Sequence, residues 1–357
     1  MEKAELLIID SFNKLAKKVA SEKNNTAALA HFIGLNNIED LCLALPISFK
    51  HLNISRLNSS NIQKLKQEYD KVLYRNYQDC NNCFNFIANL IKNVSEYLQK
   101  FDYSDNIEHK RIKLEDSMAI AYDFLKWYNL DYKETLIKLS NCGRLIFKDC
   151  ENSLITKHGI TYFSYEPNDV YILINTLNNL ITPSCIAHEI THAYYINLDN
   201  NCSYKKRIRR EYNFTGEIAS YTTELFFIDY LFEKNYSYED IFLLINDYDY
   251  YLFMLTSCWK LFFENKFKMT SIEYKNEQKE FDDDISDFFG KTIAYYLHSL
   301  NDKEKVFYLL DRIHIESKER NLLEILKNNN VDIDYIESFD YAKKLINRNW
   351  RCKNETK

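Results

Sequence analysis

Glycine and proline are scarce in this chain, and their scarcity constrains the fold more than any other feature of the sequence. Among 357 residues, 5 are glycine and 3 are proline. Sheet-rich architectures need many turns, and tight turns depend heavily on these two residues. We therefore expect a mainly α-helical protein. Apolar residues make up 46% of the sequence, so a chain of this length can bury a substantial core.

The spacing of apolar residues locates the expected helices. A first helical stripe is formed by Leu6, Leu7, Phe12, Leu15 and Val19. The 28 Tyr and 23 Phe residues are interpreted as core and helix-packing residues rather than as an aromatic binding site. Further helices are predicted at residues 26–43, 62–77, 84–98, 115–127, 132–139, 182–197, 217–232, 238–267, 284–300, 303–328 and 336–350.

A short β-prone segment interrupts the helical pattern before residue 182. Residues 160–165 are rich in strand-forming side chains, and residues 166–169 read Glu-Pro-Asn-Asp, which is a turn signal. Residues 170–174 then form a second predicted strand. We expect a small sheet next to the helix that begins with Thr182 as its N-cap and Pro183 as its first helical residue.

Charge and hydropathy exclude several classes of protein. The chain carries 46 basic and 52 acidic residues, a net charge of −6, and so lacks the basic excess of a nucleic-acid-binding protein. Residues 1–20 contain no continuous apolar segment typical of a signal peptide, and no stretch approaches the roughly 18 apolar residues of a membrane helix. The 9 cysteines, an odd number, suit reduced thiols. We expect a cytoplasmic protein with neither a nucleic-acid nor a membrane partner.

The sequence His188-Glu189-Ile190-Thr191-His192 carries the clearest chemistry of the chain. On a helix, positions i and i+4 share a face, so both imidazoles can reach one metal ion. Glu189 lies beside them and can take a proton from a water molecule at that metal. Because this H-E-x-x-H pattern is short and also occurs by chance, its surroundings must support it.

A catalytic zinc ion needs three protein ligands and one open position. Glu217 is the best candidate for the third ligand, and it follows His192 by 25 residues (217 − 192 = 25). On a helix, Glu217, Ser220 and Glu224 share one face, so Ser220 and Glu224 are expected to support the site. Two Glu residues at this spacing are also common on solvated helices, and only the preceding H-E-x-x-H favours the ligand interpretation.

Three stretches together resemble the oligoendopeptidase F branch of the thimet oligopeptidase family of zinc metallopeptidases. Residues 157–175 are similar to the family's Gly-containing loop and Tyr-Ile-Leu-x-Asn strand. Residues 186–193 match its Leu-Ala-His-Glu-x-x-His-Ala helix, with Thr191 in place of the usual Gly. Residues 216–224 are similar to its Glu-x-Ala-Ser-x-x-x-Glu helix.

Weaker similarity extends over residues 115–149, 290–297 and 329–345, so the resemblance covers roughly residues 115–350. This chain is much shorter than typical members, chiefly before the H-E-x-x-H. The resemblance therefore implies a shortened helical N-terminal lobe at residues 1–114 and a zinc metallopeptidase catalytic region at residues 115–357. It further implies the mainly helical fold of a zincin-type metallopeptidase, with a small sheet next to the H-E-x-x-H helix. A substrate channel or groove in this fold would admit short peptides.

The resemblance also assigns roles to individual residues. His188, His192 and Glu217 match the ligands of one Zn²⁺ ion per chain, and Glu189 matches the general base. An edge strand can bind an extended peptide through main-chain hydrogen bonds. The expected peptide-binding residues, in the loop and strand of the first matching stretch, are Gly159, Tyr171, Leu173 and Asn175.

One departure from the family concerns the donor that stabilises the oxyanion of the reaction. The family's His and Tyr donors lie shortly before its late Gly helix, but residues 280–290 of this chain contain neither residue type. Tyr274, Tyr295 and Tyr296 are the candidate substitutes.

These observations predict a zinc-dependent endopeptidase that hydrolyses short or unstructured peptides and that could serve one dedicated peptide substrate. The alternative is a catalytically silent zinc-containing scaffold that binds peptide without cutting it. The intact Glu189 favours the enzyme, and the missing donors favour the scaffold. A third hypothesis, a purely structural helical protein with a coincidental H-E-x-x-H, requires three accidental matches. The sequence leaves the oligomeric state and the substrate preference open.

Overall fold

The computed structural model describes residues 78, 83–103, 111–149, 158–164, 169–198, 214–264 and 271–355. The helices predicted before residue 78 lie outside these residues. The chain divides into two compact units. The first, here called the sheet unit, comprises residues 1–70 and 111–205, and the second, here called the helical unit, comprises residues 71–110 and 206–357. The predicted division at residues 114 and 115 stays a prediction.

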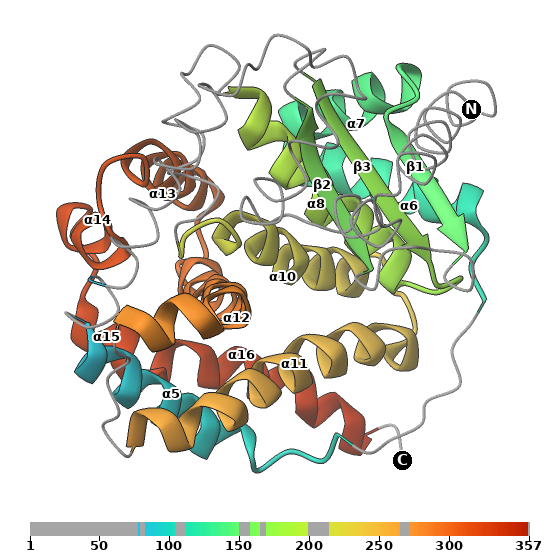
Figure 1. The fold of residues 1–357 in the computed structure, drawn as a ribbon. Coiled ribbons are helices and arrows are strands. Elements are labelled where there is room, and N and C mark those ends of the chain that lie inside the picture. Colours follow the sequence, from blue (N-terminus) through green and yellow to red (C-terminus); the bar gives the residue numbers. More distant parts are fainter. Residues whose placement is uncertain are drawn as a thin grey trace, which may run out of the picture. The chain divides into compact units, whose positions relative to one another are not determined.

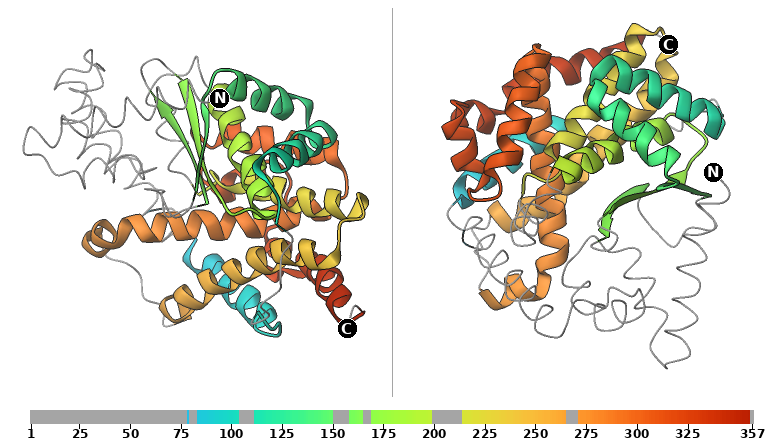
Figure 2. Two further views of the ribbon diagram at one scale, coloured as in Figure 1. Left: turned by 90° about the vertical axis from the view of Figure 1, so that its right-hand side faces the viewer. Right: turned by 90° about the horizontal axis from the view of Figure 1, so that it is seen from above.

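In its described part, the sheet unit contains three helices and a three-stranded sheet (Figure 1). Helix α8 contacts α6, α7, β2 and β3, and all three helices lie on one side of the sheet (Figure 2). The elements, in chain order, are α6 (Leu114–Tyr128), α7 (Leu130–Asn141), β1 (Leu145–Asp149), β2 (Gly159–Ser164), β3 (Asp169–Thr176) and α8 (Ile181–Leu198).

Both predicted strands are confirmed, as β2 and β3, which pair antiparallel with Ile160 opposite Leu173. Strand β1 pairs parallel with β3, a partner distant in the sequence that no hairpin turn joins to it, and the sequence does not predict β1. The strand order is β1-β3-β2, so β3 is central. Within the described sheet the edge strands are β1 and β2, so a peptide that adds to an edge would not pair directly with the Tyr171–Asn175 strand.

Helix α8 begins at Ile181, two residues before Pro183, the predicted first helical residue. The Ile181 N–H donates to the Asn179 side-chain oxygen at 2.9 Å, so Asn179 caps the helix start. The Thr182 hydroxyl instead accepts a hydrogen bond from the Leu177 N–H at 3.0 Å. Almost every turn of α8 is buried, which suits a helix enclosed between the sheet and two other helices.

The helical unit is built from helices alone in its described part. Helix α10 packs on α12, α11 packs on α5, and α16 contacts both α11 and α12. These helices, in chain order, are α5 (Phe84–Leu98), α10 (Ile218–Glu233), α11 (Tyr238–Glu264), α12 (Ser271–Ser299), α13 (Lys303–Glu316), α14 (Leu322–Asn328), α15 (Ile333–Ser338) and α16 (Asp340–Glu355).

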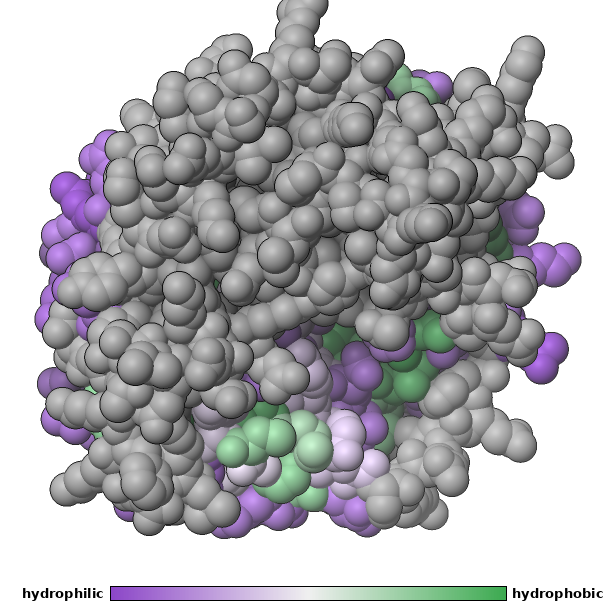
Figure 3. Space-filling model, in the orientation of Figure 1, coloured by the Kyte–Doolittle hydropathy of each residue, from purple (hydrophilic) through white to green (hydrophobic). Residues whose placement is uncertain are grey.

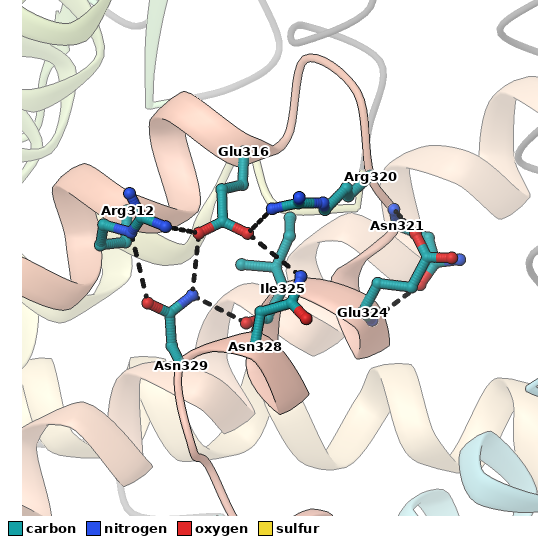
Figure 4. A network of polar contacts seen from close by, with 8 residues as sticks. All are labelled: Arg312, Glu316, Arg320, Asn321, Glu324, Ile325, Asn328 and Asn329. Carbon is teal, nitrogen blue, oxygen red and sulfur yellow. Dashed lines mark hydrogen bonds and ion pairs between the residues drawn. The ribbon is translucent and has the colours of Figure 1, made fainter.

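The predicted single helix at 303–328 is wrong, because the chain turns between α13 and α14. Glu316, with a side chain 5% exposed, forms ion pairs with Arg312 on α13 and with Arg320 in the turn that follows it. It also accepts hydrogen bonds from Asn328 and Asn329 at the end of α14 (Figure 4). At the start of α14, Asn321 and Glu324 form a capping box. The charge network closes the turn that apolar spacing does not reveal.

Asparagine takes the place of the scarce glycine at several helix ends. Asn235, Asn301 and Asn330 follow α10, α12 and α14 with positive φ angles of 57°, 53° and 57°. Asn tolerates this left-handed conformation better than other residues with a side chain. Phe339, with φ 59°, also adopts it and divides the predicted helix 336–350 into α15 and α16. Phe339 is fully buried, so core packing holds a conformation that is unusual for a bulky residue.

Aromatic side chains form much of the core, as the composition predicts. Among the largest fully buried side chains are Tyr132 and Phe124 in the sheet unit and Phe227, Phe242 and Phe288 in the helical unit.

In Figure 3 the coloured left and lower margins of the molecule are hydrophilic, and apolar residues are visible in the lower half of that face. None of the helices in the described part of the chain is long and apolar enough to span a membrane. The predicted mainly helical class with a small sheet is confirmed, and the substrate channel stays a prediction.

Candidate functional site

His188 and His192 lie one turn apart on α8, and both are partly exposed. Their Nε2 atoms are 3.1 Å apart. Two imidazole ligands, each about 2.0–2.1 Å from a tetrahedral zinc ion, have their nitrogen atoms about 3.3 Å apart. The pair therefore fits two corners of a zinc coordination shell.

Glu189 points toward strand β2 and is buried, with 6% of its surface exposed. The Thr161 hydroxyl on β2 donates to Glu189 Oε2 at 2.6 Å. Gly159 lies on the same strand, and a Cβ atom added to it would be 2.8 Å from Glu189 Oε1 and 2.5 Å from Cys185 Sγ. The contact between β2 and α8 thus leaves room for the Glu189 side chain only because residue 159 has no side chain.

Thr191 stands where the family that the sequence resembles usually has a glycine in its H-E-x-x-H motif. It is fully buried, and its hydroxyl donates to the Ala187 carbonyl at 2.9 Å. The Thr191 hydroxyl therefore has a hydrogen-bond partner within α8. Threonine at this position is compatible with the helix that carries both His residues.

Glu217, in the helical unit, directly precedes α10 and has helical backbone angles, with φ −91° and ψ −6°. The Ser220 hydroxyl lies 3.0 Å from Glu217 Oε2 and 2.9 Å from the Glu217 carbonyl oxygen. Ser220 is fully buried, whereas Glu217 is partly exposed. Ser220 thus orients a carboxylate that remains accessible at the start of the helix.

Gly290 on α12 makes a close contact with Glu217. A Cβ atom added to Gly290 would be 2.7 Å from Glu217 Cβ and 2.7 Å from Tyr221 Cδ2. These atoms belong to the stem of Glu217 and to an aromatic ring, so they cannot move aside as easily as the end of a flexible side chain. The absence of a side chain at residue 290 therefore allows Glu217 to lie this close to α12.

Lys291, next to Gly290, is buried among tyrosine rings and is 2% exposed. Its Nζ atom is 3.5 Å from the ring centroid of Tyr248 and 4.1 Å from that of Tyr221, which are cation–π contacts. Burial lowers the pKa of Lys291, and the negative charge of Glu224 acts in the opposite direction. Glu224 thus interacts with a buried cation of its own unit.

Asp287 joins two tyrosines in the same region of the helical unit. The hydroxyl of Tyr221 donates to Asp287 Oδ1 at 3.0 Å, and the hydroxyl of Tyr251 donates to Oδ2 at 2.6 Å. The pKa of Tyr221 is raised, mainly by burial and then by the negative charges of Asp287 and Glu217. The sequence does not predict this cluster, because its members come from three helices and share no local pattern.

The tyrosines that the sequence offers as substitute donors are placed differently. Tyr295 is 1% exposed, and its hydroxyl donates to the buried carboxylate of Asp249, so it cannot face a substrate. Tyr296 is 9% exposed and packs against Tyr335 and Tyr341. The side chain of Tyr274 lies outside the described part of the chain.

The predicted peptide-binding residues fall on two strands. Gly159 begins β2 and faces α8. Tyr171, Leu173 and Asn175 alternate with Ile172 and Ile174 on β3, which pair with Thr161 and Gly159. Because strand residues alternate between faces, Leu173 and Asn175 lie on the sheet face away from α8. Leu173 and Asn175 are buried. Their role in peptide binding stays a prediction.

His188 and His192 in the sheet unit offer two imidazole nitrogens, and Glu217 in the helical unit offers a carboxylate, as donors for a metal ion. Nitrogen and oxygen donors of these types are the ligands that catalytic zinc sites use. The donor chemistry therefore fits the metal that the sequence resemblance implies.

Three solved structures are similar to this chain. A putative peptidase from Chlamydophila abortus has 15% identity and a TM-score of 0.47 over 90% of this chain and 62% of its own. A putative oligoendopeptidase F from Bacillus anthracis has 12% identity and a TM-score of 0.49 over 92% and 69%. Another putative oligoendopeptidase F has 11% identity and a TM-score of 0.49 over 97% and 76%.

Two of these structures carry the name of the family that the sequence motifs resemble. The chain spans less than two thirds of the length of the Chlamydophila abortus structure. No protein-family profile matches the sequence, and no curated protein matches it. The likeness does not by itself assign an activity to this chain.

Proposed function

We propose that this protein is a zinc-dependent endopeptidase that hydrolyses short or unstructured peptides. The observation that carries the proposal is the pair of Nε2 atoms of His188 and His192, 3.1 Å apart on α8. The residue between them in the motif, Glu189, is a buried carboxylate oriented by a hydroxyl group. A metal-binding pair that adjoins an oriented acid is the arrangement that metal-assisted hydrolysis requires.

In this proposal His188, His192 and Glu217 hold one Zn²⁺ ion per chain and leave a fourth position open. When bound, zinc would lower the pKa of a water molecule to about 7 and polarise the carbonyl group of the peptide bond. Ser220 orients Glu217 through its hydroxyl. Glu224 lies on the same face of α10 as Ser220. The positive charge of the buried Lys291 offsets part of the negative charge of Glu224.

Glu189 performs the proton transfers of the reaction. It accepts a proton from the attacking water as the water oxygen bonds to the carbonyl carbon. It then delivers that proton to the nitrogen of the leaving amine as the C–N bond breaks. The products are a peptide with a new carboxyl terminus and a peptide with a new amino terminus, so the atoms of one water molecule are accounted for.

We place peptide binding at β2. An extended peptide adds most readily to an edge strand, and β2 is the edge strand whose residues contact Glu189. Gly159 belongs to this strand, and Tyr171, Leu173 and Asn175 would support it from the neighbouring β3.

Cleavage of a pool of mixed short peptides tests the proposal, with zinc measured on every variant. We compare the wild type with Glu189→Gln, which keeps the shape of the side chain but cannot accept a proton. The matched control is Glu239→Gln, an exposed residue in the first turn of α11. We expect stoichiometric zinc in all three proteins and a loss of cleavage of about 100-fold or more in Glu189→Gln alone.

Other results of this cleavage experiment would support other functions. Zinc in all three proteins without cleavage in any would support the catalytically silent, peptide-binding scaffold. Zinc in none of them would contradict both metal hypotheses and remove the ligand role of Glu217. Cleavage of most peptides in the pool would support a general oligopeptidase and contradict a dedicated peptide substrate.

A further inference from the structure

We propose that Thr161 is a positioning residue that fixes the Glu189 carboxylate for proton transfer. This inference rests on the proposed function, because it concerns the proposed general base. Thr161 lies on β2, 28 residues before Glu189 in the chain, and no part of the H-E-x-x-H motif includes it.

The contact between Thr161 and Glu189 has the geometry of a strong hydrogen bond. The distance from Thr161 Oγ1 to Glu189 Oε2 is 2.6 Å, within the range of about 2.5–2.7 Å for a hydroxyl that donates to a carboxylate. The Glu189 main-chain oxygen lies farther away, at 3.0 Å. A hydroxyl has one proton to donate, and the shorter, charged contact with the carboxylate is the stronger of the two.

Burial makes this hydroxyl important for Glu189. Thr161 and Glu189 are each 6% exposed, so little water reaches this part of the carboxylate. A buried carboxylate is costly unless donors stabilise its charge. In the part of the chain that the structure describes, Thr161 is the side chain that donates to it.

Gly159 completes the arrangement from the same strand. Residues 159 and 161 are two positions apart, so both face α8. At residue 159 the bare Cα atom gives space to Oε1, and at residue 161 the hydroxyl binds Oε2. The strand therefore fixes one carboxylate oxygen and leaves the other, Oε1, to exchange a proton with the water molecule.

The test compares Thr161→Val, which removes the hydroxyl at nearly constant volume, with Thr161→Ser, which keeps it. Thr135→Val is the matched control, since the Thr135 hydroxyl donates to the Asp131 carbonyl at 2.9 Å on α7. In zinc-loaded protein we expect Thr161→Val to lower kcat about tenfold with KM changed less than twofold. Thr161→Ser should restore most of kcat, and Thr135→Val should leave both constants unchanged.

A second measurement does not depend on activity. In metal-free protein, the thermal unfolding midpoint is measured for Thr161→Val in the wild-type background and in the Glu189→Ala background. If the hydroxyl stabilises the carboxylate, Thr161→Val lowers the midpoint clearly in the first background and by less than half as much in the second.

The two measurements separate this inference from the proposed function. If the wild type cleaves peptides and Thr161→Val retains the same kcat, the inference is overturned and the endopeptidase proposal stands. If the wild type cleaves no peptide, the proposed function fails, and the thermal comparison alone decides whether Thr161 holds Glu189. If Thr161→Val shifts the unfolding midpoint equally in both backgrounds, the Thr161 hydroxyl does not stabilise the Glu189 carboxylate, and the inference is overturned.

Discussion

At the scale of single residues, the two acidic groups of the candidate site are held in the same manner. Glu189 and Glu217 each accept a hydrogen bond from a hydroxyl and each lie against a glycine, with Thr161 and Gly159 at the first and Ser220 and Gly290 at the second. The hydroxyl orients the charge, and the glycine allows another backbone to approach the acidic side chain. Two of the 5 glycines of the chain serve this purpose.

Gly290→Ala should weaken zinc binding by displacing Glu217. The added Cβ atom would lie 2.7 Å from Glu217 Cβ, and overpacking of this kind costs about 1–3 kcal/mol. We expect a lower zinc affinity, measured by competition with a coloured chelator, together with a lower unfolding temperature. Ser286→Ala, at a partly exposed residue one turn earlier on α12, is the control. A lower unfolding temperature with unchanged zinc affinity would show that Gly290 serves helix packing alone.

At the scale of secondary-structure elements, one buried carboxylate joins three helices of the helical unit. Asp249 on α11 is fully buried, and it accepts hydrogen bonds from the Tyr295 hydroxyl on α12 and, at 2.7 Å, from the Trp350 indole on α16. Burial raises the pKa of Asp249 to about 6, although these two donors and the charge of Lys291 lower it. The helices are therefore connected by a polar group whose charge depends on pH.

Asp249→Asn should change how stability depends on pH. The folded-state pKa of about 6 is above the unfolded value of 3.8, so the folded protein binds this proton more tightly. The contribution of Asp249 to the free energy of unfolding is therefore fully present below pH 3.8 and is lost as the pH rises through about 6. Asn does not ionise, so the stability of the variant relative to wild type should increase with pH over this range, by at most about 3 kcal/mol.

Urea unfolding between pH 4 and pH 7.5 measures this difference. Asp123→Asn, which changes an exposed residue of α6, is the control and should show no such trend. A constant difference between the Asp249→Asn variant and wild type across this range would mean that Asp249 keeps its charge throughout.

At the scale of the whole molecule, the proposed zinc ligands connect stability to metal content. A metal that binds the folded chain and not the unfolded chain stabilises it by about 2.7 kcal/mol at a concentration 100 times the dissociation constant. We expect zinc to raise the unfolding temperature of metal-stripped wild type. His188→Ala should show a much smaller shift, whereas His314→Ala, on α13, should respond like wild type. Equal shifts in all three proteins would place the zinc elsewhere.

The fold class could be predicted because its signals are local. Few glycines and prolines together with periodic apolar residues predict helices, and the boundaries of α5 at Phe84 and Leu98 agree with the prediction. The prediction of one helix at 303–328 is wrong because Glu316 and its arginine and asparagine partners close a turn that no apolar period marks. Strand β1 is missing from the prediction because its parallel partner β3 is distant in the sequence, so no hairpin turn signals the pairing.

The sequence by itself determined the helical class and the chemistry of the H-E-x-x-H, because helix geometry alone places residues i and i+4 on one face. Only the tertiary structure decided that β2 rather than β3 is an edge strand and that Thr161 meets Glu189. It also decided that Tyr221 and Tyr251 share Asp287. These contacts join residues between 28 and 66 positions apart. Packing between elements sets them, and no local period records such packing.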